Sequence, residues 1–180
     1  MVFQKQIRQY IGFTTIELVV VMAIAGILIA IVVPSFQAAI KIASTTREIN
    51  AFVGDLGFAR AEAIKEGVSV TMCASSNGTS CSGSNNWQNG WIIFSNPGLT
   101  GTNIVPLRKQ LAFTSTDTLI GDNSTSAINF SLEGFTINLP GNPVTFAVQT
   151  VPLVASYTQC TAVNNAGRHV NQKSGTGNCP

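Results

Sequence analysis

The sequence predicts an α+β protein in which one long N-terminal helix packs on a small antiparallel β-sheet head. Three observations support this fold class. Residues 18–33 form an uninterrupted apolar run. An apolar stripe at three- and four-residue spacing then continues to Gly67, as in an amphipathic helix. The remaining chain consists of short, partly alternating runs between clusters of Gly, Asn, Ser and Pro, which is typical of strands and turns.

The front of the chain predicts a leader followed by a membrane-spanning segment. Residues 1–12 contain Lys5 and Arg8 and no acidic residue, which favours retention of this end on the cytoplasmic side. The apolar residues that follow are long enough, at about 1.5 Å per residue, to cross a hydrocarbon core of roughly 30 Å. We therefore expect a single helix over residues 14–66, of which residues 13–36 are the transmembrane half and residues 37–66 the amphipathic half.

The amphipathic half of the helix should pack its apolar stripe on the head. Pro34 should kink or locally unwind the helix, and Gly67 is suited to end it. Gly54 and Gly57 either weaken the helix or let a sheet approach closely, and the sequence leaves both alternatives open. The stripe consists of Ile42, Ile49, Phe52, Val53, Leu56, Ala59, Ala63 and Ile64.

Residues 67–180 are expected to form the β-rich head. Antiparallel sheets laid on the helix are the expected arrangement, because short strands follow the helix without another helix between them. The segments 131–137 and 138–146 have the composition of hairpin or tight-turn connections. Strands are predicted within 68–75, 90–95, 127–132, 135–140, 144–149 and 155–163.

Composition argues against several classes of function. The chain is 10% charged, against about 25% in typical soluble domains. Its net charge of +2 is accounted for by Lys5 and Arg8, so a broadly basic nucleic-acid-binding surface is not expected. No G-x-S-x-G or H-E-x-x-H motif is present, and the only histidine, His169, has no visible partner. The sequence thus predicts no catalytic site, no metal site and no cofactor.

The four cysteines, Cys73, Cys81, Cys160 and Cys179, predict disulfides. None of their spacings is C-x-x-C, and an even number of cysteines behind a membrane-targeting segment favours an oxidising compartment. Three pairings are possible. We favour Cys73 with Cys81 and Cys160 with Cys179, because these pairs close short loops rich in turn residues. Each bond is expected to contribute about 2–3 kcal/mol.

Glu17 is an acidic residue at the front of the apolar segment. A carboxylate at membrane depth costs about 2.5–3.5 kcal/mol and then marks a functional site with a partner. Alternatively, Glu17 lies at the membrane interface and marks where the span begins. Its position alone favours neither alternative.

Residues 12–36 resemble the N-terminal segment of type IV pilins and type II secretion pseudopilins. The shared pattern is a basic leader ending in Gly12, then Phe13, then Glu17, and a long apolar helix containing Pro34. The resemblance implies the type IV pilin fold, cleavage between Gly12 and Phe13 by a prepilin peptidase, and N-methylation of Phe13. It also implies that Glu17 pairs with the amino terminus of a neighbouring subunit during assembly.

The chain up to residue 96 is similar, more narrowly, to the GspH/FimT family of minor pilins and pseudopilins. The similarity is carried by Ala59-Arg60, Glu62-Ala63, the strand entering Cys73, and Trp87 and Trp91 in "WQNGWIIF". Packing is the ordinary role of such tryptophans.

This similarity implies a minor pilin that is needed for pilus assembly and sits at or near the tip. Its partners would be the major pilin, other minor pilins, the assembly platform and the prepilin peptidase. It would wait in the inner membrane of a Gram-negative bacterium as a single-pass protein with a periplasmic head, and then enter the pilus or pseudopilus. The alternatives are a type II secretion pseudopilin and a DNA-binding minor pilin for natural transformation.

The alternative of DNA uptake is suggested by the end of the chain. Some FimT-like proteins bind DNA through a Gly-Arg-x-Arg motif; here Gly167 and Arg168 match, but Val170 stands at the second arginine. The ordinary alternative is that Gly167 is a turn residue and Arg168 a solvated loop residue. The candidate phosphate contacts are Arg168, Lys173, His169, Arg108 and Lys109.

Overall fold

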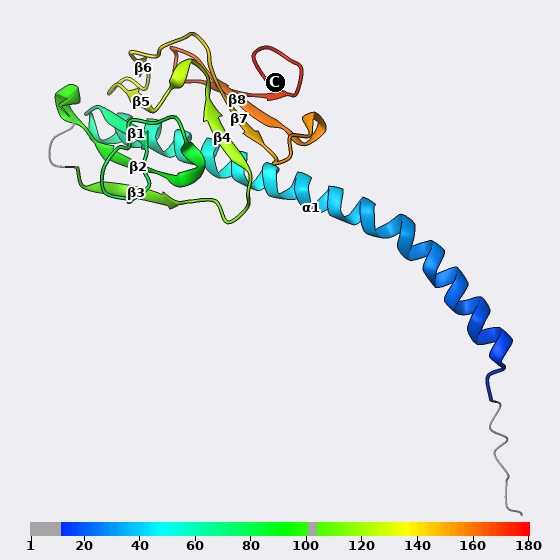
Figure 1. Ribbon diagram of the computed structural model, residues 1–180. Coiled ribbons are helices and arrows are strands. Elements are labelled where there is room, and N and C mark those ends of the chain that lie inside the picture. The colour runs from blue at the N-terminus through cyan, green and yellow to red at the C-terminus, as the bar shows by residue number, and fades with distance from the viewer. Residues whose placement is uncertain (1–11, 101–103) are drawn as a thin grey trace, which may run out of the picture. The chain divides into compact units, whose positions relative to one another are not determined.

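The computed structural model describes residues 12–100 and 104–180 (Figure 1). The chain divides into two compact units, one ending at Ile40 and the other spanning Lys41–Pro180. Each unit is described by itself. The predicted leader, residues 1–12, lies outside the described residues except for Gly12.

The helix α1 spans Thr15–Glu66, close to the predicted 14–66. It ends at Gly67, whose φ of +66° is left-handed and whose N–H donates to the Ala63 carbonyl at 3.0 Å, so the predicted glycine cap is confirmed. The helix continues through Pro34 without interruption. We predicted a kink or local unwinding at this residue, and the prediction of unwinding is wrong. Pro34 removes one N–H donor, but the helix around it persists.

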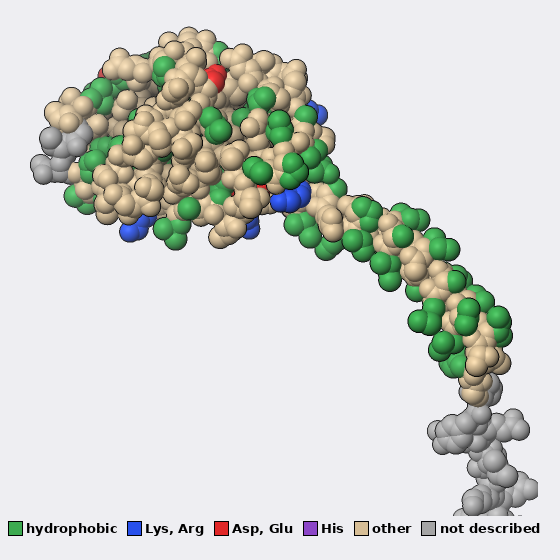
Figure 2. Space-filling model, in the orientation of Figure 1, with side chains coloured by type: hydrophobic (Ala, Val, Ile, Leu, Met, Phe, Trp, Pro, Cys, Tyr) green, Lys and Arg blue, Asp and Glu red, His purple; other side chains and the backbone are tan. Residues whose placement is uncertain are grey.

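The part of α1 before Lys41 exposes nearly all of its side chains. α1 is long and apolar enough to cross a membrane, and none of its most apolar stretch is buried. Hydrophobic side chains cover the first part of α1 on the face shown in Figure 2. All side chains from Thr15 to Phe36 are exposed in the described structure.

The head contains two antiparallel sheets (Figure 1). The first has the order β3-β2-β1-β5-β6 and the second the order β4-β7-β8-β9. The first sheet consists of β1 (Val70–Ala74), β2 (Gly90–Ser95), β3 (Pro106–Leu111), β5 (Ala127–Phe130) and β6 (Thr136–Ile137). The second consists of β4 (Thr118–Gly121), β7 (Val144–Gln149), β8 (Gln159–Val163) and β9 (His169–Lys173). Short 3-10 helices lie at Trp87–Asn89, Pro97–Leu99, Asp122–Ser124 and Ala155–Tyr157.

Each of the six predicted strand segments contains a strand, but three strands were not predicted: β3, β4 and β9. The turn within 131–137 closes the β5–β6 hairpin, with Gly134 N–H donating to the Ser131 carbonyl at 2.8 Å. The connection 138–146 instead carries the chain from β6 in the first sheet to β7 in the second. Interpreting this connection as a hairpin is therefore wrong.

The core of the head forms around Phe52, which is fully buried on α1. Its ring centroid lies 5.3 Å from that of Trp87, 5.4 Å from that of Trp91 and 4.8 Å from that of Phe146. Trp91 belongs to β2 and Phe146 to β7, so this one ring contacts both sheets. Both tryptophans are core residues, as their ordinary packing role predicts.

The apolar stripe of α1 is buried in its middle and exposed at its two ends. The buried members are Ile49, Phe52, Leu56, Ala59 and Ala63, whereas Ile42 and Ile64 are exposed. A Cβ atom added at Gly54 or Gly57 would meet nothing within 4 Å. These two glycines therefore do not serve close approach to a sheet.

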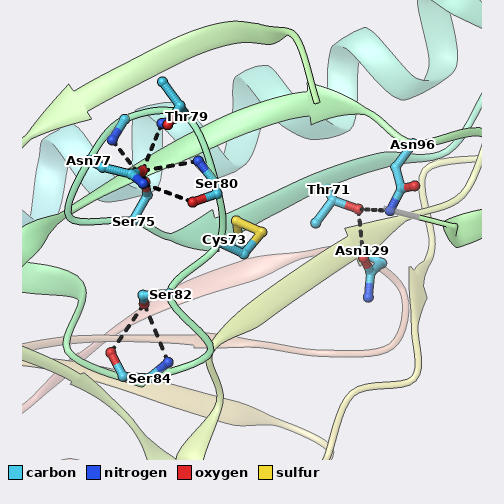
Figure 3. The surroundings of a disulfide bond; sticks show 12 residues. Thr71, Cys73, Ser75, Asn77, Thr79, Ser80, Ser82, Ser84, Asn96 and Asn129 are labelled. Carbon is cyan, nitrogen blue, oxygen red and sulfur yellow. Dashed lines mark hydrogen bonds between the residues drawn. A yellow bond between two sulfur atoms is a disulfide. The ribbon is translucent and has the colours of Figure 1, made fainter. Parts of the chain in front are cut away.

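Two disulfides staple the head, Cys73–Cys81 and Cys160–Cys179. The first closes a loop after β1 that Asn77 organises: its Oδ1 accepts the N–H groups of Thr79 and Ser80 at 2.9 and 3.0 Å (Figure 3). The second holds the C-terminal segment against the outer face of β8, where Cys160 and Cys179 pack with Ala147.

Replacing Phe52 by alanine should destabilise the head by about 3–5 kcal/mol, because it empties the space between both sheets. Phe135→Ala is the matched control: its ring is 54% exposed, and the expected change is within about 0.5 kcal/mol. Urea unfolding of the full chain in detergent, followed by fluorescence of the two buried tryptophans, measures both. Similar losses for the two variants would contradict this account of the core.

Candidate functional site

The predicted processing and assembly residues gather at the free end of α1. Gly12 and Phe13 precede the helix, Phe13 is 80% exposed, and Glu17 lies exposed in the first turn. No described residue of the chain covers them.

Glu17 also has a local structural role that the sequence reasoning missed. Its N–H donates to Thr14 Oγ1 at 3.3 Å, so Thr14 caps the helix and Glu17 stands at the third helical position. The spacing Thr-x-x-Glu, visible in the sequence, is the capping-box pattern. A carboxylate here is stabilised by the positive end of the helix dipole, which offsets part of the cost of placing it in an apolar segment.

Glycine at position 167 has a packing explanation. Gly167 is buried with φ +68°, and a Cβ at this position would collide with the Gly134 carbonyl oxygen and lie 3.3 Å from Arg60 Nε. The turn 164–168 is thus packed on the β5–β6 turn and on α1. This close approach requires glycine at position 167, so its presence there is not evidence that Arg168 binds DNA.

His169 and Lys173 are exposed on β9, the open edge of the second sheet, and Arg168 is exposed immediately before it. His169 and Lys173 share one face of the strand, since strand residues two apart point the same way. They are spaced by roughly 13 Å. Charged side chains on an edge strand also prevent it from pairing with the sheets of other molecules. Such protection of the edge is a structural role that these cations can have without binding DNA.

Arg108 and Lys109 do not form a common patch. As neighbours on β3 they point to opposite faces of the sheet. Arg108 Nε contacts Asp55 Oδ1 at 3.0 Å, and its guanidinium lies 5.3 Å from the ring centroid of Phe58. On the face shown in Figure 2, the Lys and Arg side chains lie at separate points around the head.

Three buried carboxylates went unnoticed in the sequence. Asp55 is satisfied, because it accepts Trp91 Nε1–H at 2.8 Å besides its contact with Arg108. Glu48 is 5% exposed and Asp117 is 2% exposed. Burial raises the pKa of the Glu48 carboxyl; hydrogen bonds from Ser115 and Ser44 lower it, and the charge of Asp117 raises it. The sequence could have indicated that Glu48 and Asp55 are buried. They lie seven residues apart, about two helical turns, and therefore share the helix face that buries Phe52.

Comparisons with known proteins agree with this architecture. The family model described as "Type II transport protein GspH" matches residues 48–167. Comparison with curated protein sequences gives no match. Two crystal forms of the type IV minor pilin FimU from Pseudomonas aeruginosa have 23% sequence identity to this chain and TM-scores of 0.58 and 0.56. They cover 77% and 73% of this chain, and this chain covers 93% of each of them.

The structural likeness confirms the predicted type IV pilin fold, one long apolar N-terminal helix packed on antiparallel sheets. The family model spans well over half of the chain, from Glu48 on α1 to Gly167 before β9. The chain therefore belongs to the GspH family of type II transport proteins.

Proposed function

We propose that this chain is a minor pilin, a structural subunit that a type IV pilus needs for its assembly, placed at or near the tip. The observation that carries the proposal is the exposed apolar segment of α1, which presents Gly12, Phe13 and Glu17 at its free end. The head behind it has the fold of FimU, which is a type IV minor pilin. The family is one of structural pilins rather than of enzymes.

Assembly would begin with cleavage of the leader 1–12 by a prepilin peptidase and N-methylation of Phe13. The new terminal amine of one subunit then pairs with Glu17 of the next. A carboxylate in apolar surroundings is tolerable when a cation satisfies it, and costly when it stays alone. Glu17 would thus fix the register, since a misplaced subunit leaves it unpaired. The partners are the major pilin, other minor pilins and the assembly platform.

Before assembly, residues 13–36 would hold the chain in the inner membrane of a Gram-negative cell, with residues 37–66 and the head 67–180 in the periplasm. A helix that is apolar all round must be buried in lipid or among other helices. Transfer from the membrane to the core of the filament satisfies this requirement at both stages.

A type II secretion pseudopilin is the second candidate in the same class, and the family description favours it. Deleting the chain's gene and measuring surface pili, secreted proteins and transformation in parallel separates the candidates. A minor pilin predicts loss of pili with normal secretion. Loss of secretion with normal pili would overturn the proposal in favour of the pseudopilin.

Glu17→Ala should abolish or strongly reduce incorporation into the filament, because the amine of the next subunit loses its partner. Incorporation is measured by immunoblot of sheared filaments, and N-terminal sequencing beginning at methylated Phe13 shows that processing is intact. Glu133→Ala, which removes an exposed carboxylate of the head, is the matched control and should assemble normally. Normal incorporation of Glu17→Ala would refute the pairing.

DNA binding during uptake is a third candidate. It is favoured by the exposed side chains of His169 and Lys173 on the edge strand β9 and of Arg168 just before it. No ion pair in the described parts of the chain engages them. Phosphate contacts by such cations give salt-dependent affinity.

If this candidate is correct, Arg168→Ala should weaken binding of a short duplex several-fold and lower the salt slope by about 1. Gel-shift titration of the detergent-solubilised full chain measures both. Lys65→Ala removes an equal charge from the end of α1 and should bind normally. No shift of the unmodified protein at low salt would eliminate DNA binding.

A further inference from the structure

The connection between β7 and β8 exposes a run of apolar side chains. It comprises residues 150–158, and within it Val151 is 53%, Leu153 63% and Val154 36% exposed. A single exposed apolar residue is ordinary on a protein surface. Several in one loop are a candidate contact with another molecule or with lipid.

Polar bonds hold this loop in a fixed shape. Thr150, which is 3% exposed, donates from Oγ1 to the Pro152 carbonyl at 2.9 Å, and the same oxygen accepts the Val154 N–H at 3.2 Å. Further along, the Thr158 N–H donates to the Ala155 carbonyl at 3.0 Å. The loop is therefore shaped without burying its apolar side chains, and it presents them to its surroundings.

The loop lies at the end of the head where α1 enters it (Figure 1). Thr118 of β4 pairs with Gln149 at the end of β7. The segment just before β4 meets the start of the buried part of α1, because Ser115 Oγ donates to Glu48 Oε1 at 2.7 Å. At its other end, β8 continues into the turn 164–168, which packs on the later part of α1. The second sheet thus runs along the helix.

The end of the head that carries the loop exposes cations and buries its acids. Arg47 is exposed on α1. Lys173 is exposed on β9, where it pairs with Gln159 directly after the loop. The acids at this end, Glu48 and Asp117, are 5% and 2% exposed. This end therefore offers positive charge to its surroundings.

The opposite end of the head has the reverse distribution of acids. Glu66 is exposed where α1 ends. Glu133 is exposed in the β5–β6 turn, and the next residue, Gly134, lies against the side chain of Ile64 near the end of the same helix. An anionic surface is therefore attracted to the end with the loop and not to this one.

A polar cavity of about 370 Å³ lies on the β8 side of the loop. Thr158 lines it and is 3% exposed, and its Oγ1 has no hydrogen-bond partner among the described residues. A lysine among hydroxyl groups is suited to hold a phosphate group. The lining residues are Ser156, Thr158, Gln159, Lys173 and Ser174.

We propose that this end of the head docks on the surface of an anionic lipid bilayer. The apolar side chains of the loop 150–158 enter the headgroup layer, and Arg47 and Lys173 contact lipid phosphates. Apolar side chains flanked by cations are the usual composition of such an interfacial contact. The inference rests on the proposed function, in which residues 13–36 cross the membrane before assembly.

The dimensions of the head allow this contact. Phe146 of β7 packs on Phe52 of α1, with ring centroids 4.8 Å apart. From there β7 extends about 10 Å to Gln149, and the chain from Gln149 to Leu153 spans up to about 13 Å more. The helix from Phe52 back to residue 36 is about 24 Å long. The loop therefore reaches the level at which the proposed span ends.

Leu153→Trp in the full chain, reconstituted in phosphatidylglycerol vesicles, tests the contact. Trp87 and Trp91 are buried, and their emission is subtracted with the unmodified chain. Brominated phosphatidylglycerol should quench the added emission about twofold, because the loop lies in the headgroup layer. Phe135→Trp is the matched control, since Phe135 is 54% exposed at the opposite end of the head, and its added emission should stay unquenched.

The cations are tested in the same vesicles. Arg47→Glu combined with Lys173→Glu should reduce the quenching at position 153, and so should replacing phosphatidylglycerol by phosphatidylcholine. Quenching that neither change reduces would refute the role of the cations.

Two further results would overturn the proposal as a whole. One is the absence of quenching at position 153 in phosphatidylglycerol. The other is a blue shift of this emission in detergent that grows with protein concentration, which would assign the loop to a second copy of the chain. Neither result depends on pili, so failure of the membrane contact is distinguished from failure of the proposed function, which the gene deletion tests.

Discussion

The head depends on the burial of one face of α1 against two sheets at once. No strand of one sheet pairs with a strand of the other in the described structure. Side-chain packing on α1 therefore holds the two sheets, together with loop hydrogen bonds such as that from Thr136 N–H to the Asn165 carbonyl at 3.0 Å. Phe52 contacts Trp91 of β2 and Phe146 of β7, and Trp87 contacts Phe146 as well. A single helix face therefore sets the position of both sheets, and the turns that bring α1, β6 and residues 164–168 together follow from it.

The same face carries two buried acids, Asp55 and Glu48, which differ in their partners. Asp55 and Glu48 lie two helical turns apart. Asp55 receives an indole N–H and a guanidinium, which balance its charge and hold β3 on the helix. Arg108 is thereby explained as the partner of Asp55. Glu48 accepts hydrogen bonds from the hydroxyls of Ser44 and Ser115, and the charges of Asp117 and Arg47 act on its pKa in opposite directions.

The sequence predicted the elements whose own residues are apolar enough to indicate that they are buried. β1, β2 and β7 are apolar runs packed in the core, and the stripe of α1 identified Phe52 and Leu56. It did not predict β3, which begins with Pro106 and carries adjacent cations, or β9, which is polar. Both are edge strands. An edge strand forms because the neighbouring strand offers backbone hydrogen bonds, and its own side chains do not indicate that this neighbour is present. The crossing after β6 was missed for the same reason, since Gly and Pro mark a turn without saying which sheet follows.

The candidate sites differ in the same way. Gly12, Phe13 and Glu17 lie within six residues of one another, so the sequence alone was enough to propose them as processing and assembly residues. Folding brings Glu48 to Ser115, 67 residues further along the chain, and the sequence around either residue does not indicate this contact. Glu17 is the one charged residue of the segment 13–40, and that segment packs on nothing within the described chain. If Glu17 pairs with the terminal amine of a neighbouring subunit, as we propose, its carboxylate would exchange the partial charge of the helix dipole for a full opposite charge, and the exchange of lipid for protein would be favoured when the register is correct.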